Sequence, residues 1–168
     1  AMTQLGGHAI YFAPSDVGLG KRESIHDVAK TLSGQVDAIA ARTFKHSTIL
    51  ELAKHADIPA INALSNEEHP CQALADFLTI KEHFGRTNIK FAYVGDGNNV
   101  CHSLMLLGAL LGADMRIACP ITHLPKKEYT LKSTFDLYDN GGSIHLTTPE
   151  GAIEDADIIY TDTWTSMG

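Results

Sequence analysis

Residues 90–99 read K-F-A-Y-V-G-D-G-N-N. The run from Lys90 to Val94 is largely apolar without alternation, as in a parallel strand that is covered on both faces. A glycine-bounded turn follows it. An apolar stripe then repeats at helical spacing through Val100, Leu104, Leu107 and Leu111. A strand, a tight turn and a buried helix in this order predict an α/β fold with a mostly parallel sheet.

The same alternation extends along the chain in both directions. Helices are expected after Ser24, after Thr48, over 70–84 and after Gly97, and a less regular one before Asn140. Strands are expected at His8–Phe12, Asp37–Ala41, Ala60–Leu64, Lys90–Val94, Met115–Cys119, Ser143–Thr147 and Ile158–Thr161. This is many strands for one sheet, and the helix over 70–84 lies midway. We therefore predict two doubly wound parallel-sheet domains, at 1–69 and 85–168, joined by residues 70–84 as a long connecting helix.

Composition excludes several classes of function. Thirteen basic residues against twenty acidic ones give a net charge of −7, which argues against nucleic acid or an anionic membrane as a partner. The longest apolar stretch, 104–113, is about half the roughly 20 residues that span a bilayer. No signal peptide is evident at the start, and the three cysteines include no C-x-x-C pair. These features predict a reduced, cytoplasmic protein.

The turn at 95–99 lies where a dinucleotide fingerprint would be, but its spacing does not fit. Gly95 and Gly97 supply the first two glycines, whereas the third position is Val100. Asp96 would also place a negative charge beside a pyrophosphate. A nicotinamide or flavin site is therefore disfavoured, and a plain strand-to-helix turn capped by Asn98 or Asn99 is as plausible as a ligand role.

His69-Pro70-Cys71-Gln72 opens the helix over 70–84. Pro70 suits the first turn, so His69 and Gln72 would lie at the positive end of the helix dipole. An imidazole and an amide there can both donate to one carbonyl or phosphate oxygen, as acyl transfer requires. The alternative is a capping histidine beside a solvated glutamine.

Two further polar clusters follow expected strands. Arg42 could fork onto a carbonyl or phosphate oxygen, although a lone arginine more often forms a surface ion pair. Asp162 and Ser166 follow the last strand, where a carboxylate and a hydroxyl suit an ammonium group and exposed backbone N–H groups suit a carboxylate. Together they could hold the zwitterionic end of an amino acid, unless they form only a polar loop.

Three motifs together make the chain resemble the aspartate/ornithine carbamoyltransferase family over its whole length. They are His69-Pro-Cys-Gln-Ala-Leu-Ala-Asp76, Gly95-Asp-Gly-Asn-Asn99 and Asp162-Thr-Trp-Thr-Ser-Met-Gly168. The H-P-x-Q element is shared across that family, and the D-x-x-x-S-M-G element is typical of its ornithine branch. The resemblance implies transfer of the carbamoyl group of carbamoyl phosphate to the δ-amine of L-ornithine, in arginine metabolism.

The resemblance also assigns residues to the two substrates. Arg42, His69 and Gln72 would contact carbamoyl phosphate and carry the catalysis, and the ornithine contacts would be Asn99, Asp162, Ser166 and Met167. It implies no metal or organic cofactor, and a homotrimer or a multiple of one. The loop Gly18–Arg22 resembles a loop that approaches the neighbouring subunit's site.

The chain departs from the family's pattern at both ends. Members carry a Ser-Thr-Arg-Thr-Arg motif upstream and a His-Cys-Leu-Pro motif downstream, and neither occurs in these 168 residues. We expect an internal fragment that is inactive alone. Two other interpretations remain open: a non-catalytic module that binds an amino acid or phosphate, and another branch of the family, such as one acting on putrescine. The S-M-G ending argues against putrescine, which has no carboxylate to hold.

Overall fold

The computed structural model describes residues 2–130 and 140–163. The chain forms two compact units, which are described separately: residues 1–40 with 47–61, and residues 41–46 with 62–168. Strands β1 (Ile39–Arg42) and β2 (Ala60–Leu64) form a two-stranded sheet, and the unit boundary falls within both strands.

The first unit is mainly helical, with η1 (Thr3–Leu5), α1 (Pro14–Val17), α2 (Ile25–Ser33) and most of α3 (His46–His55). The predicted start of α2 is confirmed, since Ser24 Oγ accepts the Asp27 N–H at 3.1 Å. The predicted start of α3 at Thr48 is wrong: the helix begins at His46, whose N–H is bound by Asn66 Oδ1 at 2.9 Å.

The predicted strand at His8–Phe12 is also wrong, because these residues form no regular element. Ile10, Tyr11 and Phe12 are exposed rather than covered. An apolar run of this kind predicts a buried strand, but a strand needs a ladder partner, and none pairs with this segment among the described residues.

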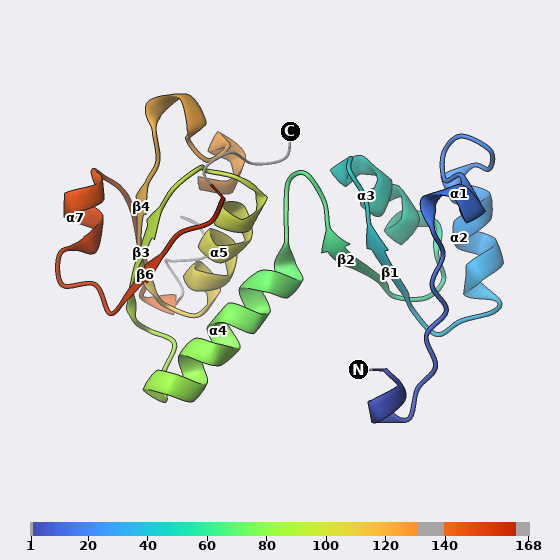
Figure 1. The fold of residues 1–168 in the computed structure, drawn as a ribbon, viewed down its shortest axis with the longest axis horizontal. Helices are drawn as coiled ribbons and strands as arrows, with labels where there is room; N and C mark the ends of the chain where they lie inside the picture. Colours follow the sequence, from blue (N-terminus) through green and yellow to red (C-terminus); the bar gives the residue numbers. More distant parts are fainter. Residues whose placement is uncertain (1, 131–139, 164–168) are drawn as a thin grey trace. The chain divides into compact units, whose positions relative to one another are not determined.

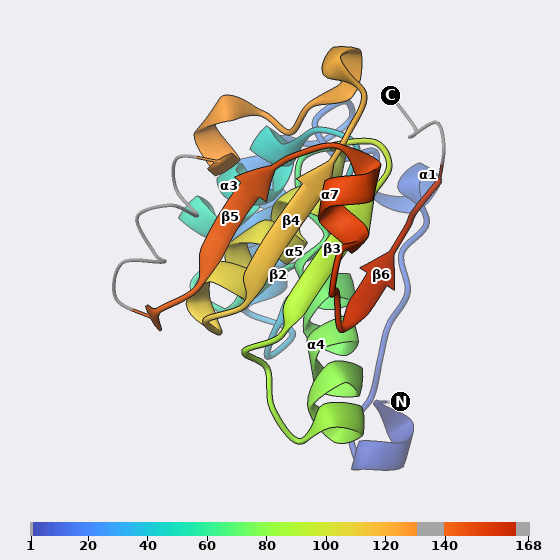
Figure 2. The same cartoon turned by 90° about the vertical axis from the view of Figure 1, so that its left-hand side faces the viewer.

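The second unit is built on a four-stranded sheet in the order β5-β4-β3-β6, and every pairing in it is parallel. Its strands are β3 (Lys90–Val94), β4 (Asp114–Ala118), β5 (Ser143–Leu146) and β6 (Ile158–Tyr160), with η2 (Ile121–His123) after β4. Helices α4 (Pro70–Phe84) and α5 (Asn99–Leu110) lie on one side, and α7 (Pro149–Ile153) lies on the other (Figures 1 and 2). The remaining predicted strands are thus confirmed within one or two residues, and the fold is α/β with parallel pairing.

Both faces of the central strand β3 are buried, which explains its unbroken apolar run. Phe91 and Tyr93 join the large core with α4 and α5, whereas Ala92 packs with Ala118 and with Ala152 of α7. Small side chains on the second face let the short helix α7 approach the sheet closely.

Helix α4 has the predicted bounds and the predicted ends. Pro70 is its first residue, and Gly85 ends it in the left-handed conformation with φ of 69°. The proposed boundaries at 1–69 and 85–168, and the connecting role of α4, stay predictions; the helix before Asn140 falls on 131–139, outside the described residues. In the described part of the chain, no helix has the length and apolarity to cross a membrane.

Candidate active site

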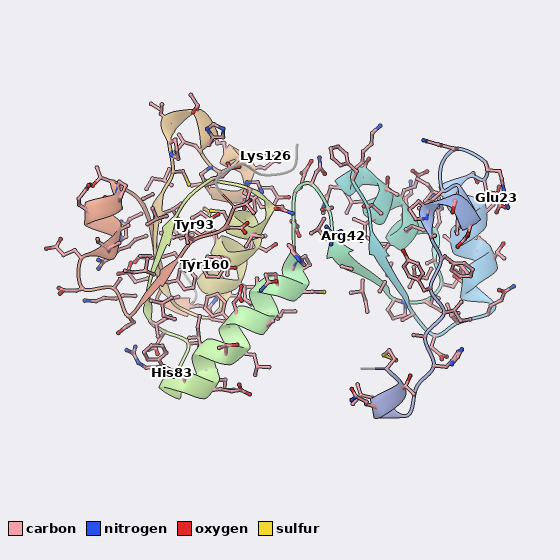
Figure 3. All side chains as sticks on the ribbon, in the orientation of Figure 1. Glu23, Arg42, His83, Tyr93, Lys126 and Tyr160 are labelled. Atoms are coloured by element: carbon pink, nitrogen blue, oxygen red, sulfur yellow. The ribbon has the colours of Figure 1, made fainter. Side chains whose placement is uncertain are left out.

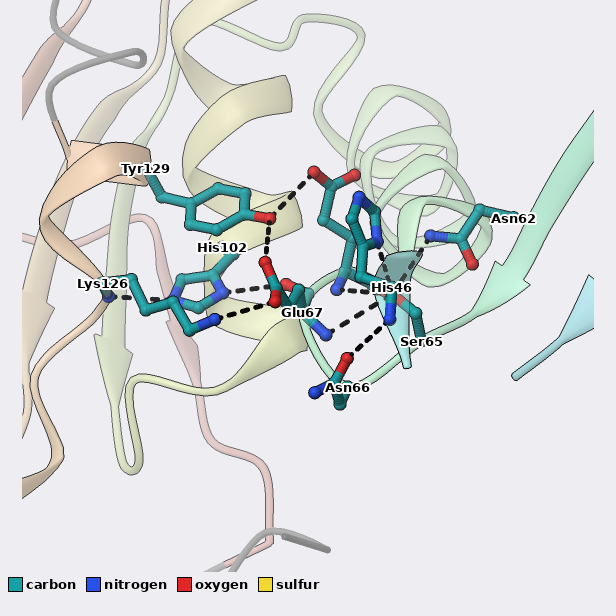
Figure 4. A network of polar contacts seen from close by, with 9 residues as sticks. His46, Asn62, Ser65, Asn66, Glu67, His102, Lys126 and Tyr129 are labelled. Atoms are coloured by element: carbon teal, nitrogen blue, oxygen red, sulfur yellow. Dashed lines mark hydrogen bonds and ion pairs between the residues drawn. The ribbon is translucent and has the colours of Figure 1, made fainter. Parts of the chain in front are cut away.

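A buried serine fixes the loop between β2 and α4, which carries His69. Ser65 is 0% exposed, and its Oγ lies 2.8 Å from His46 Nδ1 and accepts the Glu68 N–H at 3.2 Å (Figure 4). Its carbonyl oxygen accepts from Asn99 Nδ2 at 2.8 Å. The backbone between β2 and α4 is therefore fixed by side chains on both sides of it.

Helix α5 holds the same loop through two consecutive residues. Ser103 Oγ accepts the His69 N–H at 2.8 Å. His102 Nε2 accepts the Lys126 N–H at 3.0 Å, so the ring proton is on Nδ1, which donates to the Glu67 carbonyl at 2.8 Å. Burial lowers the pKa of His102, which keeps the ring neutral and this pair of bonds intact.

Charged and aromatic groups surround that histidine (Figure 4). The Tyr129 ring stacks on His102 with centroids 4.1 Å apart, and its hydroxyl donates to Glu68 Oε1 at 3.1 Å. Lys126 Nζ forms an ion pair with Glu67 at 3.0 Å, and its hydrogen bond holds the pKa of that carboxyl below its usual value. Sequence reasoning did not identify this network, because its members are scattered from 46 to 129.

The His69 side chain is left free for a ligand. It occupies the N-cap position of α4 but makes no capping hydrogen bond, so the capping interpretation is wrong. Its Nδ1 is buried and has no hydrogen-bond partner among the described residues. Burial, and then the charge of Arg42, lower its pKa, while Asp162 and Asp76 oppose that shift. A neutral imidazole thus lies within the field of these three charges.

Arg42, at the end of β1, is the second donor without an internal partner. Its side chain is exposed, and no ion pair involves it among residues 2–130 and 140–163 (Figure 3). The alternative of a surface ion pair is therefore wrong for the described chain. Its charge contributes to lowering the pKa of His69, and a guanidinium can donate two parallel hydrogen bonds to an oxygen ligand.

Gln72 is fixed rather than solvated. Its Nε2 donates to Asp76 Oδ1 at 2.9 Å, and Asp76 Oδ2 accepts from the Tyr160 hydroxyl at 3.1 Å. In the sequence, Asp76 has no role beyond its place at the end of the H-P-C-Q motif, and Tyr160 has none beyond the apolar run of a strand. Asp76 lies one helical turn after Gln72, a spacing that could have indicated the contact.

On the far side of the site, Asp162 is anchored by an asparagine. Asn98 caps α5 by accepting the N–H groups of Val100 and Cys101, and its Nδ2 donates to Asp162 Oδ2 at 2.8 Å. Asn99 is occupied as well, since it donates to the Ser65 carbonyl and accepts the Val100 N–H. Ser166 and Met167 lie outside the described residues.

The second glycine of the G-D-G-N-N turn has a packing role. A Cβ at Gly97 would lie 2.3 Å from the backbone nitrogen of Pro125, and the Gly97 N–H donates to the His123 carbonyl at 2.8 Å. Only glycine allows the chain after β4 to pass so closely. Packing against Pro125 therefore explains this glycine, and a bound phosphate is not needed to explain it.

Sequence comparison places two family models end to end on the chain. Residues 1–82 match "Aspartate/ornithine carbamoyltransferase, carbamoyl-P binding domain", and residues 87–168 match "Aspartate/ornithine carbamoyltransferase, Asp/Orn binding domain". A catabolic ornithine carbamoyltransferase of Thermoplasma acidophilum is 51% identical over 170 residues, covering 100% of this chain. An ornithine carbamoyltransferase of Shewanella oneidensis is 52% identical over 169 residues, covering 99% of it.

Solved structures agree with the sequence comparison. The ornithine carbamoyltransferase of Pyrococcus furiosus matches 98% of this chain with a TM-score of 0.95 and 47% identity, over 53% of its own length. The chain likewise spans 56% of the Thermoplasma and Shewanella relatives. The motifs, the parallel fold and these matches lead to one assignment.

Proposed function

The chain belongs to the aspartate/ornithine carbamoyltransferase family, and from that premise we propose that it transfers the carbamoyl group of carbamoyl phosphate to the δ-amine of L-ornithine. The products are L-citrulline and phosphate. The observation that carries the proposal is the pair of donors without a partner among the described residues: the half-buried His69 ring, whose Nδ1 is buried, and the Arg42 guanidinium, whose charge acts on it.

On the carbamoyl side, His69 and Arg42 would both bind the carbonyl oxygen of carbamoyl phosphate. When the δ-amine attacks the carbonyl carbon, that oxygen gains negative charge, and each well-placed donor then contributes about 3–4 kcal/mol to the transition state. Gln72 would orient the carbamoyl NH₂ group. Its fixed amide suits this role, because orientation costs no further entropy on binding.

On the ornithine side, Asp162 and Ser166 would hold the α-ammonium, and Asn99 with the Met167 backbone would hold the α-carboxylate. The bond from Asn98 leaves Asp162 Oδ1 for the ligand. The attacking amine must be neutral, whereas an unperturbed lysine-like amine has a pKa of about 10.4. Holding the zwitterionic end fixes the δ-amine beside the carbonyl, so its small neutral fraction reacts in an effectively unimolecular step.

A full-length chimera tests the reaction. In this chimera, the present 168 residues replace the 170 matching residues of the Thermoplasma acidophilum relative. We expect citrulline to form from carbamoyl phosphate and ornithine, and no N-carbamoylputrescine to form when putrescine replaces ornithine. The chain alone, which spans 56% of that relative, is expected to turn over negligibly.

A chimera that binds ornithine or phosphate but releases no citrulline would favour the non-catalytic binding module instead. Turnover of putrescine would assign the chain to another branch. We also propose a homotrimeric state in the cytoplasm, carried by the family resemblance; sedimentation of the chimera gives its subunit number.

A further inference from the structure

Gln72 is bound to a short relay that runs from α4 to the last described strand. Gln72 and Asp76 lie one turn apart on α4, and the amide Nε2 donates to Asp76 Oδ1 at 2.9 Å. The second carboxylate oxygen accepts from Tyr160 Oη at 3.1 Å, from β6. Both oxygens of Asp76 are therefore used, each by a different element.

The far end of this relay is rigid. The Tyr160 ring stacks on Phe91 and Tyr93 of β3, with centroids 5.7 and 5.9 Å apart. Tyr93 and Tyr160 lie close to one another in Figure 3. Burial and the nearby Asp76 carboxylate raise the pKa of Tyr160, so its hydroxyl stays protonated and remains a donor. Tyr160 thus holds Asp76 at a fixed position relative to the sheet.

The carboxylate decides which way the amide of Gln72 faces. An ionised carboxylate only accepts hydrogen bonds, so the amide must turn its NH₂ group toward Asp76. The carbonyl oxygen Oε1, on the other arm of the amide, is then directed away from Asp76 and can accept a hydrogen bond from another group. An acceptor held in that orientation binds an NH₂ group and offers nothing to a methyl group in the same place.

We propose that Asp76 and Tyr160 are positioning residues that hold Gln72 Oε1 toward the carbamoyl NH₂, and so make the site select carbamoyl phosphate over acetyl phosphate. This inference rests on the proposed function for the identity of the ligand. The two acyl phosphates differ only at the group that Gln72 would face. Discrimination by a fixed hydrogen-bonding group is effective, because the wrong ligand leaves a polar atom unpaired.

The test compares Asp76→Ala and Tyr160→Phe in the chimera. Asp76→Ala should lower kcat/KM for carbamoyl phosphate about ten- to hundred-fold, as expected for a lost hydrogen bond to a charged group. Tyr160→Phe keeps the ring stack and removes only the hydroxyl, so it should cost about two- to ten-fold. Glu82→Ala, which removes an exposed carboxylate from the same helix, is the matched control and should change nothing.

A structural role alone would not change selectivity. We therefore expect Asp76→Ala to reduce the preference for carbamoyl phosphate over acetyl phosphate, measured as KM against the inhibition constant. In a Gln72→Ala background, Asp76→Ala should change that preference by less than about two-fold. If Asp76 acts only through Gln72, its effect is already lost when Gln72 is removed. Equal losses with and without Gln72 would overturn the proposal.

Calorimetry separates this inference from the proposed reaction. If the chimera forms no citrulline, the proposed function fails. The affinities for carbamoyl phosphate and for acetyl phosphate still decide the relay: a preference for carbamoyl phosphate that needs both Gln72 and Asp76 supports it. No preference, or one that survives Asp76→Ala, contradicts it.

Discussion

The starts of α4 and α5 in the second unit differ in whether their side chains are hydrogen-bonded within the protein. At the start of α4, the backbone of the preceding loop is held by Ser65, His102 and Ser103, while the His69 ring makes no capping bond. At the start of α5, the side chains do the holding: Asn98 caps the helix and binds Asp162, and Asn99 binds the Ser65 carbonyl.

This difference distinguishes side chains that are available to bind substrate from side chains that stabilise the fold. A donor whose loop is fixed by other residues is ready for a ligand at little cost in reorganisation. A side chain that is already hydrogen-bonded within the protein must share or exchange that bond to take part in binding. Substitutions at the first helix start should therefore change catalysis alone, and those at the second should change stability as well.

The largest effect should follow from His69→Ala in the chimera. We expect kcat to fall by roughly 10²–10³-fold, the scale of one lost oxyanion donor. The urea midpoint should stay nearly unchanged, because the ring caps no helix and its Nδ1 has no partner among the described residues. Steady-state citrulline formation and urea unfolding measure the two quantities.

His83→Ala is the matched control, since it removes an exposed histidine from the last turn of the same helix. A His69→Ala variant that keeps kcat within a few-fold would remove His69 from the mechanism. One that unfolds at much lower urea would remove the contrast between the two helix starts.

A smaller effect is expected at Asn98, and it should appear in stability. Asn98→Ala removes a helix cap and leaves Asp162 without this anchor, so we expect a loss of about 1–3 kcal/mol in the free energy of unfolding. Asn98→Asp keeps an oxygen for the cap but places two carboxylates together. It should retain most of the stability and raise the KM for ornithine.

Hydrogen exchange at the Val100 and Cys101 N–H groups reports the cap directly. Exchange that is fast in Asn98→Ala and slow in Asn98→Asp is the expected pattern. If both variants are as stable as the parent, Asn98 does not stabilise the start of α5, and this prediction is wrong.

Much of the fold could be predicted because it depends on local chemistry. Pro70 and Gly85 mark the ends of α4, and the apolar run of β3 indicates a strand covered on both faces. The strand expected at His8–Phe12 shows the limit, because an apolar run predicts burial only if another element covers it. Covering elements depend on tertiary structure, which the local pattern does not contain.

The site was predictable only where its residues follow strands or open helices. The candidate residues Arg42, His69, Gln72 and Asp162 stand at such positions, which is why the sequence indicated them, and their roles stay predictions. Asp76 and Tyr160 are separated by 84 residues in the chain and act through one carboxylate. Asn98 was weighed only as a cap, since nothing in the sequence shows that Asp162 lies beside it.

The smallest effect concerns pH and the network that fixes the His69 loop. Burial lowers the pKa of His102 below its ordinary value of 6.5, Lys126 lowers it further, and Glu67 and Glu68 oppose the shift. Between the lowered value and 6.5 the unfolded chain binds the proton and the folded chain does not, so stability falls as pH drops through this range. Protonation would also break the bond that Nε2 accepts from Lys126.

His102→Gln removes this titration while keeping a polar side chain at the same place. The free energy of unfolding of the chimera, measured with urea, should fall between pH 7 and pH 5.5. It should fall less in His102→Gln, and the difference is limited to about 1.4 kcal/mol for each unit by which folding lowers the pKa of His102. His83→Gln, at an exposed position, should leave the acid dependence unchanged. An identical pH dependence with and without His102 would mean that the folded chain does not hold the ring neutral, and would contradict this prediction.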